Sequence, residues 1–299
     1  MDSFGGFPKH ITVIGVGLIG GSLSLAIKKR FAEVTITGVD KPTVLRKARR
    51  LVVIDRAEPS LHQAVANADL VVLATPVGEI MRLLPDVAKH CPPGTIVTDV
   101  GSVKEPIMRL AARYFRNGNF VGGHPLAGSE RGGVEAAQSD LLENATYVLC
   151  PLPTTPRPSI SKLRRFISYL GARPLISDAH SHDGTVATLS NLPQLLAVGI
   201  ANVAGTKGRE LKMSGGGLRD MTRLASSPFD VWEDILSYNR ANIKKALRIL
   251  QTELSAYEHF LRDGKMRGMK RKFARARRVR QIIKRSGDTR TLKQKLSPS

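Results

Sequence analysis

The chain has 299 residues, of which 46 are Lys or Arg and 25 are Asp or Glu, so its net charge at pH 7 is +21. A hydrophobic content of 42%, with 27 glycines and 17 prolines, is typical of a globular protein and excludes a disordered or collagen-like chain. The two cysteines, Cys91 and Cys150, belong to no Cys/His cluster, so we expect neither a disulfide framework nor a bound metal. This cysteine usage fits a reducing, cytoplasmic location best.

Most of the positive charge lies in the last 36 residues. Residues 264–299 hold 14 Lys or Arg against one acidic residue, Asp288, which leaves +8 for the rest of the chain. In this segment apolar residues recur at steps of three or four, as they would along one side of a helix: Met266, Met269, Phe273, Ala276, Val279 and Ile283. We predict an amphipathic basic helix here. It either covers apolar surface of the same protein or binds an anionic partner such as RNA, DNA or lipid.

Short β-branched runs alternate with longer helical stretches up to about residue 178, which is typical of a parallel sheet covered by helices. Strands are expected at residues 11–14, 34–39, 70–74, 95–98, 119–121, 146–149 and 174–176, and helices at 18–30, 77–90, 103–116 and 159–170. We therefore predict an α/β protein with a Rossmann-type doubly wound parallel sheet in residues 8–178. An all-α dimerisation domain (179–262) and a basic tail (263–299) follow.

The helical part contains two further signals. One long helix is expected from Ser227-Pro228 to Asp263-Gly264. Apolar residues in it follow heptad-like steps, suited to packing within one subunit or against a second one: Ile243, Leu247, Leu250, Leu254, Tyr257 and Leu261. The most apolar window, residues 186–204, is interrupted by polar side chains, so we predict a buried helix and no membrane span.

A glycine-rich turn with the sequence GVGLIG follows the first expected strand and opens the first expected helix. A dinucleotide-binding loop occupies this position in Rossmann folds. Gly15 permits the tight turn, Gly17 lets the backbone approach a pyrophosphate, and Gly20 allows the helix to pack closely on the strand. At the start of the helix, Leu18 and Ile19 contribute free N–H groups for the anion. The turn therefore predicts a dinucleotide site.

Two other positions support this site. Asp40 comes 20 residues after Gly20, at the end of the second expected strand, where a carboxylate accepts hydrogen bonds from ribose hydroxyls. Because that carboxylate would repel a 2′-phosphate, NAD is favoured over NADP, although the neighbouring Lys41 leaves NADP open. Thr75 and Pro76 follow the third expected strand and should line the cofactor cleft.

Three more segments carry polar residues: DVGSVK at 99–104, GGHPLAGSE at 122–130 and GGGLRDMTR at 215–223. Together with the glycine turn they resemble the prephenate dehydrogenase family, which includes arogenate dehydrogenases. The resemblance covers about residues 8–262. It implies NAD-dependent oxidative decarboxylation of prephenate to 4-hydroxyphenylpyruvate in tyrosine biosynthesis, with oxidation of arogenate to tyrosine as the alternative.

The resemblance also implies roles for three residues. His124 matches the catalytic histidine, and an imidazole with a pKa near neutrality suits an acceptor of the hydroxyl proton. Ser102 matches a serine that orients this imidazole and binds the substrate hydroxyl; a cap for the following helix is the other interpretation. Arg223 matches an arginine that binds a substrate carboxylate, for which the guanidinium fork is suited.

Other substrate-binding candidates follow from the same resemblance. Ser190 falls on a serine of the substrate cleft, and Ser129 and Glu130 adjoin the histidine segment, where Glu130 could pair with Arg223. At Gln194 the chain departs from many prephenate-using relatives, which have a histidine there. A glutamine binds a carboxylate without a titratable charge, so prephenate is favoured but arogenate stays open. For Ser190 and Gln194, polar packing within a helix is the alternative.

A function of a different class is nucleic-acid binding through the basic tail of a dehydrogenase scaffold. The intact set Asp40, Ser102, His124 and Arg223 favours the enzyme. We therefore expect a dicarboxylate substrate and a second copy of the chain as partners, with no membrane.

Overall fold

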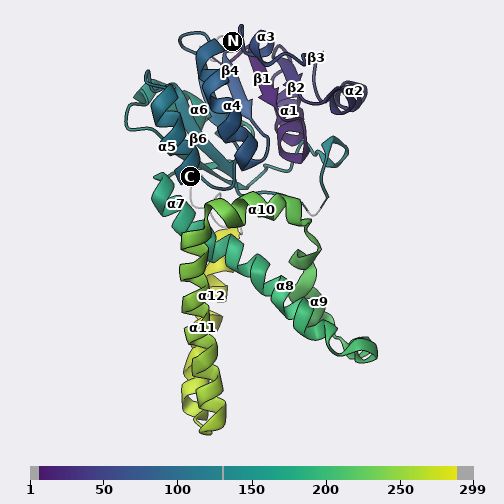
Figure 1. Ribbon diagram of the computed structural model, residues 1–299, viewed down its shortest axis with the longest axis vertical. Coiled ribbons are helices and arrows are strands. Elements are labelled where there is room, and N and C mark those ends of the chain that lie inside the picture. The colour runs from purple at the N-terminus through teal and green to yellow at the C-terminus, as the bar shows by residue number, and fades with distance from the viewer. Residues whose placement is uncertain (1–6, 130, 288–299) are drawn as a thin grey trace, which may run out of the picture. The chain divides into compact units, whose positions relative to one another are not determined.

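The computed structural model describes residues 7–129 and 131–287 (Figure 1). The chain divides into two compact units between Ile243 and Lys244. The predicted domain borders near residues 178 and 262 stay predictions.

An eight-stranded sheet forms the centre of the first unit, in the order β3-β2-β1-β4-β5-β6-β7-β8. Its strands are β1 His10–Ile14, β2 Thr35–Val39, β3 Arg56–Ala57, β4 Leu70–Leu73, β5 Ile96–Asp99, β6 Phe120–Pro125, β7 Thr146–Pro151 and β8 Arg173–Ile176. This arrangement confirms the predicted Rossmann-type α/β fold, whose strands run in the order 3-2-1-4-5-6. The dinucleotide half of the sheet is wholly parallel.

The sheet departs from the predicted parallel arrangement at one pairing, because β6 and β7 are antiparallel. The segment between them forms a single short 3-10 turn, η1 Val134–Ala136, in its described part. A parallel connection is usually completed by a crossover helix, and without one the chain returns in the opposite direction.

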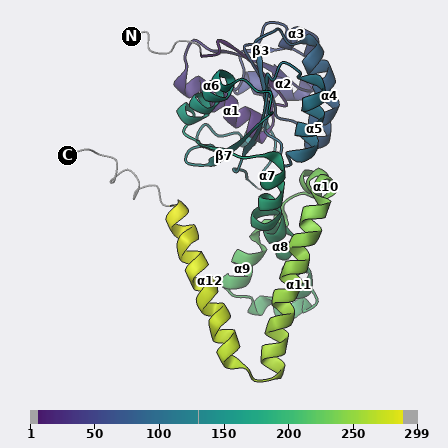
Figure 2. The same cartoon turned by 90° about the vertical axis from the view of Figure 1, so that its left-hand side faces the viewer.

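Helices cover both faces of the sheet (Figure 2). On one face lie α1 Leu18–Arg30, α2 Pro42–Arg50 and α6 Arg157–Tyr169, and on the other α3 Leu61–Val65, α4 Val77–His90 and α5 Glu105–Tyr114. Each layer buries its own apolar cluster against the β-branched side chains of the strands. The short elements α2, α3 and β3 were not predicted, because α2 is strongly charged and the other two are only five and two residues long.

Strand β6 is longer than the predicted run 119–121 and continues to Pro125. Gly122 and Gly123 conceal the strand signal in the sequence. A Cβ on Gly123 would lie 2.4 Å from the backbone oxygen of Asp99, so glycine is required for this close approach. His124 therefore lies inside a strand, opposite Val148 of β7.

The helical segment of the first unit begins with α7 Ala179–Val186, whose N-terminus is capped by Asp178. It continues through a π-helical turn η2 Ala187–Asn191, α8 Leu192–Gly205, η3 Gly208–Met213, α9 Gly216–Thr222, η4 Arg223–Ser226, α10 Phe229–Tyr238 and the start of α11 Arg240–Arg262. All of these are helical, as predicted after residue 178.

The single long helix predicted from 227 to 264 is wrong, since α10 ends at Tyr238 and α11 starts at Arg240. Asn239 between them is buried. Its amide nitrogen lies 3.0 Å from the backbone oxygen of Asp183 and 3.1 Å from Oδ1 of Asn191. The interruption thus places one polar side chain against α7 and the π-helical turn.

The prediction that residues 186–204 form a buried helix is also wrong for the single chain. Leu189 is 74% exposed and Val203 is 71% exposed. The run Ala179–Gly205 is long and apolar enough to span a membrane by length and composition, but it buries polar residues: His182, Asp183, Asn191 and Gln194. An apolar exposed face with a polar buried one is suited to packing against another protein chain.

The second unit contains the remainder of α11 and α12 Met266–Gly287, which run in opposite directions (Figure 2). Gly264 makes the reversal with a φ of +63°. Lys272 pairs with Glu253 at 2.6 Å, and Gly268 leaves room for the Phe260 ring. The helix predicted in the basic tail is therefore present, while residues 288–299 lie outside the described residues.

Candidate active site

The glycine turn between β1 and α1 has little room for side chains at two of its positions. Gly15 has a φ of +94°, and a Cβ there would lie 2.7 Å from the backbone of Ala74. A Cβ on Gly20 would lie 2.0 Å from the Gly15 oxygen. A Cβ on Gly17 would meet nothing within 4 Å, so the turn is open at the residue expected to face a pyrophosphate.

Asp40 joins the end of β2 to this turn. Its Oδ2 accepts a hydrogen bond of 2.8 Å from the backbone N–H of Val16, and its Oδ1 accepts one of 2.7 Å from Lys41. Each carboxylate oxygen keeps a second acceptor position, which is what two ribose hydroxyls require.

A cavity of about 500 Å³ lies at the carboxyl ends of β1, β4 and β5. The predicted cofactor residues Gly17, Leu18, Ile19, Thr75 and Pro76 line it, together with Ser102 and Ser129. Its remaining wall includes α10, which sequence reasoning did not assign to the site. Asp234 of α10 accepts a 2.8 Å hydrogen bond from the backbone N–H of Gly78 and so ties α10 to the first turn of α4.

Two observations fit a dinucleotide in this cavity. The hydroxyl of Thr75 is buried there and has no hydrogen-bond partner among the described residues, so a bound ligand could satisfy it. The N-terminus of α1 has no side-chain cap, which leaves its N–H groups available to a phosphate.

Ser102 lines the cavity, and the structure tests the interpretation of this residue as a helix cap. Helix α5 starts later than predicted, at Glu105, and Asp183 of α7 caps it: its carboxylate accepts hydrogen bonds of 2.7 and 2.8 Å from the N–H groups of Lys104 and Glu105. Ser102 is therefore not the cap of α5, and it lines the cavity. Its part in catalysis stays a prediction.

A buried carboxylate holds the Ser102 segment next to the His124 strand. Oδ1 of Asp99 accepts a 3.0 Å hydrogen bond from the N–H of Gly123, and Oδ2 accepts one of 2.8 Å from Gly101. Oδ2 also pairs with the Lys104 ammonium, and both side chains of this ion pair are fully buried. The ion pair of Asp99 and Lys104 thus fixes the backbone next to Ser102 and the backbone next to His124.

His124 belongs to a chain of buried side chains. Its Nδ1 lies 2.8 Å from Nε2 of His182, and Nδ1 of His182 lies 2.7 Å from Oδ1 of Asp183. His124 is 9% exposed, and His182 and Asp183 are more deeply buried. Burial, and then the nearby His182 and Lys104, lower the pKa of His124 well below its usual value. The imidazole is therefore neutral at pH 7 and able to accept a proton.

Three of the other predicted substrate residues lie apart from the cavity lining: Ser190, Gln194 and Arg223. Ser190 is exposed on the π-helical turn, and Arg223 is exposed at the start of η4. Gln194 is buried and donates a 3.0 Å hydrogen bond to the backbone oxygen of Leu224, so it holds η4 against α8. Ser129 accepts a hydrogen bond from the Arg131 N–H and does line the cavity. Glu130 lies outside the described residues. The substrate roles of these residues stay predictions.

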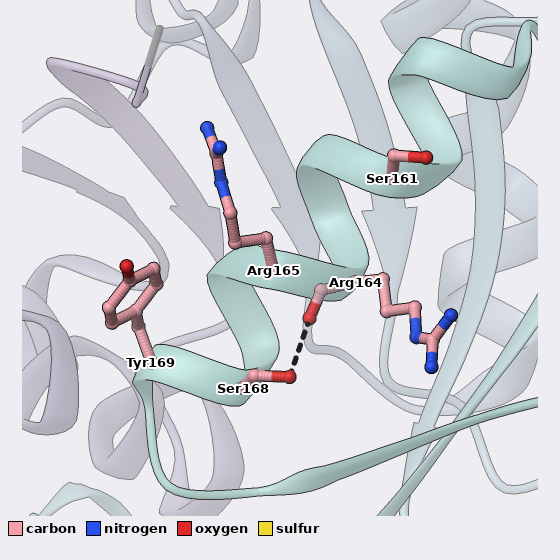
Figure 3. Close-up of a pocket in the computed structure, with 5 residues that line it drawn as sticks. All are labelled: Ser161, Arg164, Arg165, Ser168 and Tyr169. Atoms are coloured by element: carbon pink, nitrogen blue, oxygen red, sulfur yellow. Dashed lines mark hydrogen bonds between the residues drawn. The ribbon is translucent and has the colours of Figure 1, made fainter. Parts of the chain in front are cut away.

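A further hollow of about 450 Å³ on α6 is a weaker candidate (Figure 3). All of its lining residues come from that one helix: Ser161, Arg164, Arg165, Ser168 and Tyr169. The Ser168 hydroxyl already donates to the backbone oxygen of Arg164 at 3.1 Å, and Arg165 lies over the Phe7 ring. None of the predicted site residues lies in it, so we assign it no catalytic role.

The chain matches two domain profiles over most of its length. The nucleotide-binding domain of prephenate dehydrogenase matches residues 23–176, and the dimerization domain of prephenate dehydrogenase matches residues 178–275. The chain belongs to the prephenate dehydrogenase family. Like other members, it is an oxidoreductase with an NAD-binding domain and a dimerization domain.

Individual relatives agree with this assignment. A prephenate dehydrogenase of Lactococcus lactis is 34% identical over 276 residues, which cover 86% of this chain and 76% of the relative. The A. aeolicus prephenate dehydrogenase, solved with hydroxyphenyl propionate and NAD+, is 25% identical with a TM-score of 0.84 over 92% of this chain and 98% of its own. The Synechocystis arogenate dehydrogenase is 27% identical with a TM-score of 0.80, over 92% and 99% of the two chains.

Proposed function

We propose that this protein is an NAD-dependent prephenate dehydrogenase in which His124 takes the hydroxyl proton of the substrate. The observation that carries this proposal is the neutral, buried imidazole of His124, held by hydrogen bonds on strand β6 beside the segment of Ser102. A base needs a free lone pair at working pH, and the lowered pKa of His124 keeps that lone pair free. This pKa lies below the near-neutral value expected from the sequence, because burial disfavours the charged imidazole.

Different residues would bind the cofactor, bind the substrate hydroxyl and transfer its proton. NAD, when bound, supplies the hydride acceptor. Gly17 and the N-terminus of α1 would hold its pyrophosphate, and Asp40 its ribose. Ser102 would bind the substrate hydroxyl in the cavity, and His124 would take the proton of that hydroxyl as the ring carbon loses its hydride. Carbon dioxide then leaves, its bonding electron pair aromatises the ring, and the proton returns from His124 to the phenolate oxygen.

Prephenate rather than arogenate is the substrate that this proposal favours. Prephenate carries two carboxylates and no ammonium group, and the first 263 residues carry a net charge of +8. Arg223 is the candidate for one carboxylate. Arogenate, which has an amine where prephenate has a keto group, is the alternative substrate. The Synechocystis arogenate dehydrogenase has a similar fold, so the fold alone does not exclude it.

A homodimer is part of the proposal. The matched dimerization domain includes the exposed apolar residues of α7 to α9, among them Leu189, Val203 and Met221. In a dimer a second copy of the chain would cover this surface, which explains why so apolar a helical run is exposed in one subunit. A cytoplasmic location stays a prediction.

Nucleic-acid binding is a second candidate function and rests on α12. This helix has no acidic residue between Met266 and Gly287, and Phe273 and Ile282 on it are exposed. A polyanion would be bound through the basic side chains in a salt-dependent way. Removing residues 265–299 should then abolish retention on immobilised RNA or DNA at low salt while dehydrogenase activity persists. Equal retention of both forms would contradict this function.

The dehydrogenase itself is tested with purified full-length protein, NAD or NADP, and prephenate or arogenate, by following formation of the reduced cofactor. We expect turnover with NAD and prephenate to exceed each of the other three combinations. Preferred turnover of arogenate would shift the assignment within the family, and absence of turnover in all four would contradict it.

A further inference from the structure

We propose that His182 and Asp183 are positioning residues that fix the tautomer of His124 and leave its Nε2 atom as the proton acceptor. The proposal rests on the proposed function and assigns to these two residues of α7 a part in the same proton transfer. They do not line the cavity, and they act through His124.

The Asp183 carboxylate has hydrogen-bond partners at both of its oxygens. Oδ1 accepts from the backbone N–H of Lys104 and also faces Nδ1 of His182, and Oδ2 accepts from the N–H of Glu105. A backbone N–H can only donate, so this carboxylate is held as an acceptor at both oxygens. The hydrogen on the 2.7 Å contact to His182 therefore belongs to the ring nitrogen Nδ1.

The tautomers of both histidines follow from that hydrogen. A neutral imidazole with its proton on Nδ1 has a lone pair on Nε2, so His182 accepts at Nε2. Its partner across 2.8 Å is Nδ1 of His124, which must then donate and carry the proton. His124 is left with an unprotonated Nε2, for which the described residues provide no hydrogen-bond partner. This is the form that a general base needs.

The other charged and titratable groups around the hydrogen-bonded side chains of His124, His182 and Asp183 are either paired or neutral. The ammonium of Lys104, the residue before α5, is paired with Asp99 of β5 in a fully buried ion pair. The Tyr147 hydroxyl of β7 is buried and has no hydrogen-bond partner in the described part of the chain, and burial raises its pKa, so it stays neutral. Among the described residues, Asp183 is thus the carboxylate available to balance a positive charge on the two imidazoles.

The same arrangement serves the step after proton transfer. When His124 takes the hydroxyl proton on Nε2, its Nδ1–H can pass to Nε2 of His182, whose Nδ1–H already faces Asp183. The positive charge then lies next to a buried carboxylate, which offsets the cost of burying the imidazolium. The reverse transfer returns a proton for the phenolate oxygen.

The first measurement reads the tautomer directly, independently of turnover. In protein labelled with ¹⁵N-histidine, two-bond ¹H–¹⁵N spectra distinguish protonation at Nδ1 from protonation at Nε2, and His124→Asn identifies the signals of His124. We expect His124 to be protonated at Nδ1. Protonation at Nε2 in the wild-type protein would overturn the proposal.

The second measurement compares kcat and KM for variants at His182. His182→Gln keeps an acceptor for the His124 N–H, whereas His182→Phe removes it. We expect kcat to fall about 10-fold in the first and 10²-fold or more in the second, with the KM for prephenate and the Kd for NAD nearly unchanged. His180→Gln is the matched control on the same helix, because the His180 side chain is 81% exposed, and it should keep the wild-type kcat.

Asp183→Asn completes the test. An amide that donates to His182 would reverse both tautomers, so kcat should fall 10²-fold or more while bound NAD is retained. Because Asp183 also caps α5, thermal unfolding of Asp183→Asn is measured alongside. If this variant does not fold, the test rests on the two His182 variants. Equal kcat values for His182→Gln and His182→Phe at equal stability would contradict the positioning role. A wild-type enzyme without turnover would contradict the proposed function and leave the tautomer measurement valid.

Discussion

The two sides of the candidate site are built in opposite ways. On the cofactor side, the turn of Gly15, Gly17 and Gly20 presents backbone N–H groups, and close packing excludes side chains at Gly15 and Gly20. On the base side, His124 depends on buried charged and polar side chains that come from residues 99 to 183. The cofactor side should therefore be sensitive to added volume, and the base side to lost charge or hydrogen bonds.

The largest effect is expected on the base side, from Lys104→Met. This change leaves the Asp99 carboxylate buried without its counter-charge, which should lower the free energy of unfolding by about 3–5 kcal/mol. Chemical denaturation measures it. The double variant Lys104→Met/Asp99→Asn should recover part of the loss, and Arg82→Met, at an exposed ion pair with Glu79, should change little. Equal losses for Lys104→Met and Arg82→Met would contradict the dependence of the base side on its buried ion pair.

On the cofactor side, two alanine substitutions in one turn should separate packing from binding. Gly20→Ala places a Cβ 2.0 Å from the Gly15 oxygen and should lower the free energy of unfolding by about 1–3 kcal/mol. Gly17→Ala meets nothing within 4 Å and should leave stability unchanged while weakening NAD binding. Thermal unfolding and NAD titration measure the two properties, and a similar loss of stability in both variants would contradict this account.

Asp40→Asn tests the choice of cofactor with a smaller effect. Loss of the carboxylate removes a charged acceptor for the ribose hydroxyls, so the Kd for NAD should rise about tenfold. Discrimination against NADP should decrease at the same time, because the repulsion of a 2′-phosphate is lost. An unchanged ratio of NAD to NADP affinity would show that Asp40 acts only on Val16 and the turn.

The pH dependence of stability gives the smallest expected effect. The pKa of His124 in the folded protein lies below the unfolded value of about 6.5, so its contribution is fully present above pH 6.5. As the pH falls below 6.5, the unfolded chain takes up a proton that the folded chain does not. The free energy of unfolding should decline by at most about 1.4 kcal/mol per pH unit from this group. In His124→Asn that part of the slope should disappear, and an unchanged slope would contradict the depressed pKa.

Local sequence signals predicted the helices and strands around the cofactor cavity well, but not the side-chain contacts of the base side. The glycine turn and the β-branched strands are contiguous patterns, and the predicted helices 18–30 and 77–90 have the observed bounds. The contact between His124 and His182 spans 58 residues, and that between Lys104 and Asp183 spans 79, so no spacing along the chain indicates them. The adjacent pair His182-Asp183, located after the last strand, was the one available signal.

The helical segment shows why its details could not be predicted. The sequence around Asn239 continues an uninterrupted helical pattern, and the break is set by hydrogen bonds of the Asn239 side chain to Asp183 and Asn191 in other elements. Likewise, the apolar run containing Leu189 is exposed because its covering partner is expected to be another chain. Both features depend on tertiary or quaternary contacts.

The most direct test of the central claim is the steady-state kcat of wild type and His124→Asn with prephenate and saturating NAD. We predict one NADH and one carbon dioxide per prephenate in the wild type, and a loss of kcat of about 10²- to 10⁴-fold in the variant with NAD affinity nearly unchanged. A variant that keeps the wild-type kcat would show that His124 is not the base.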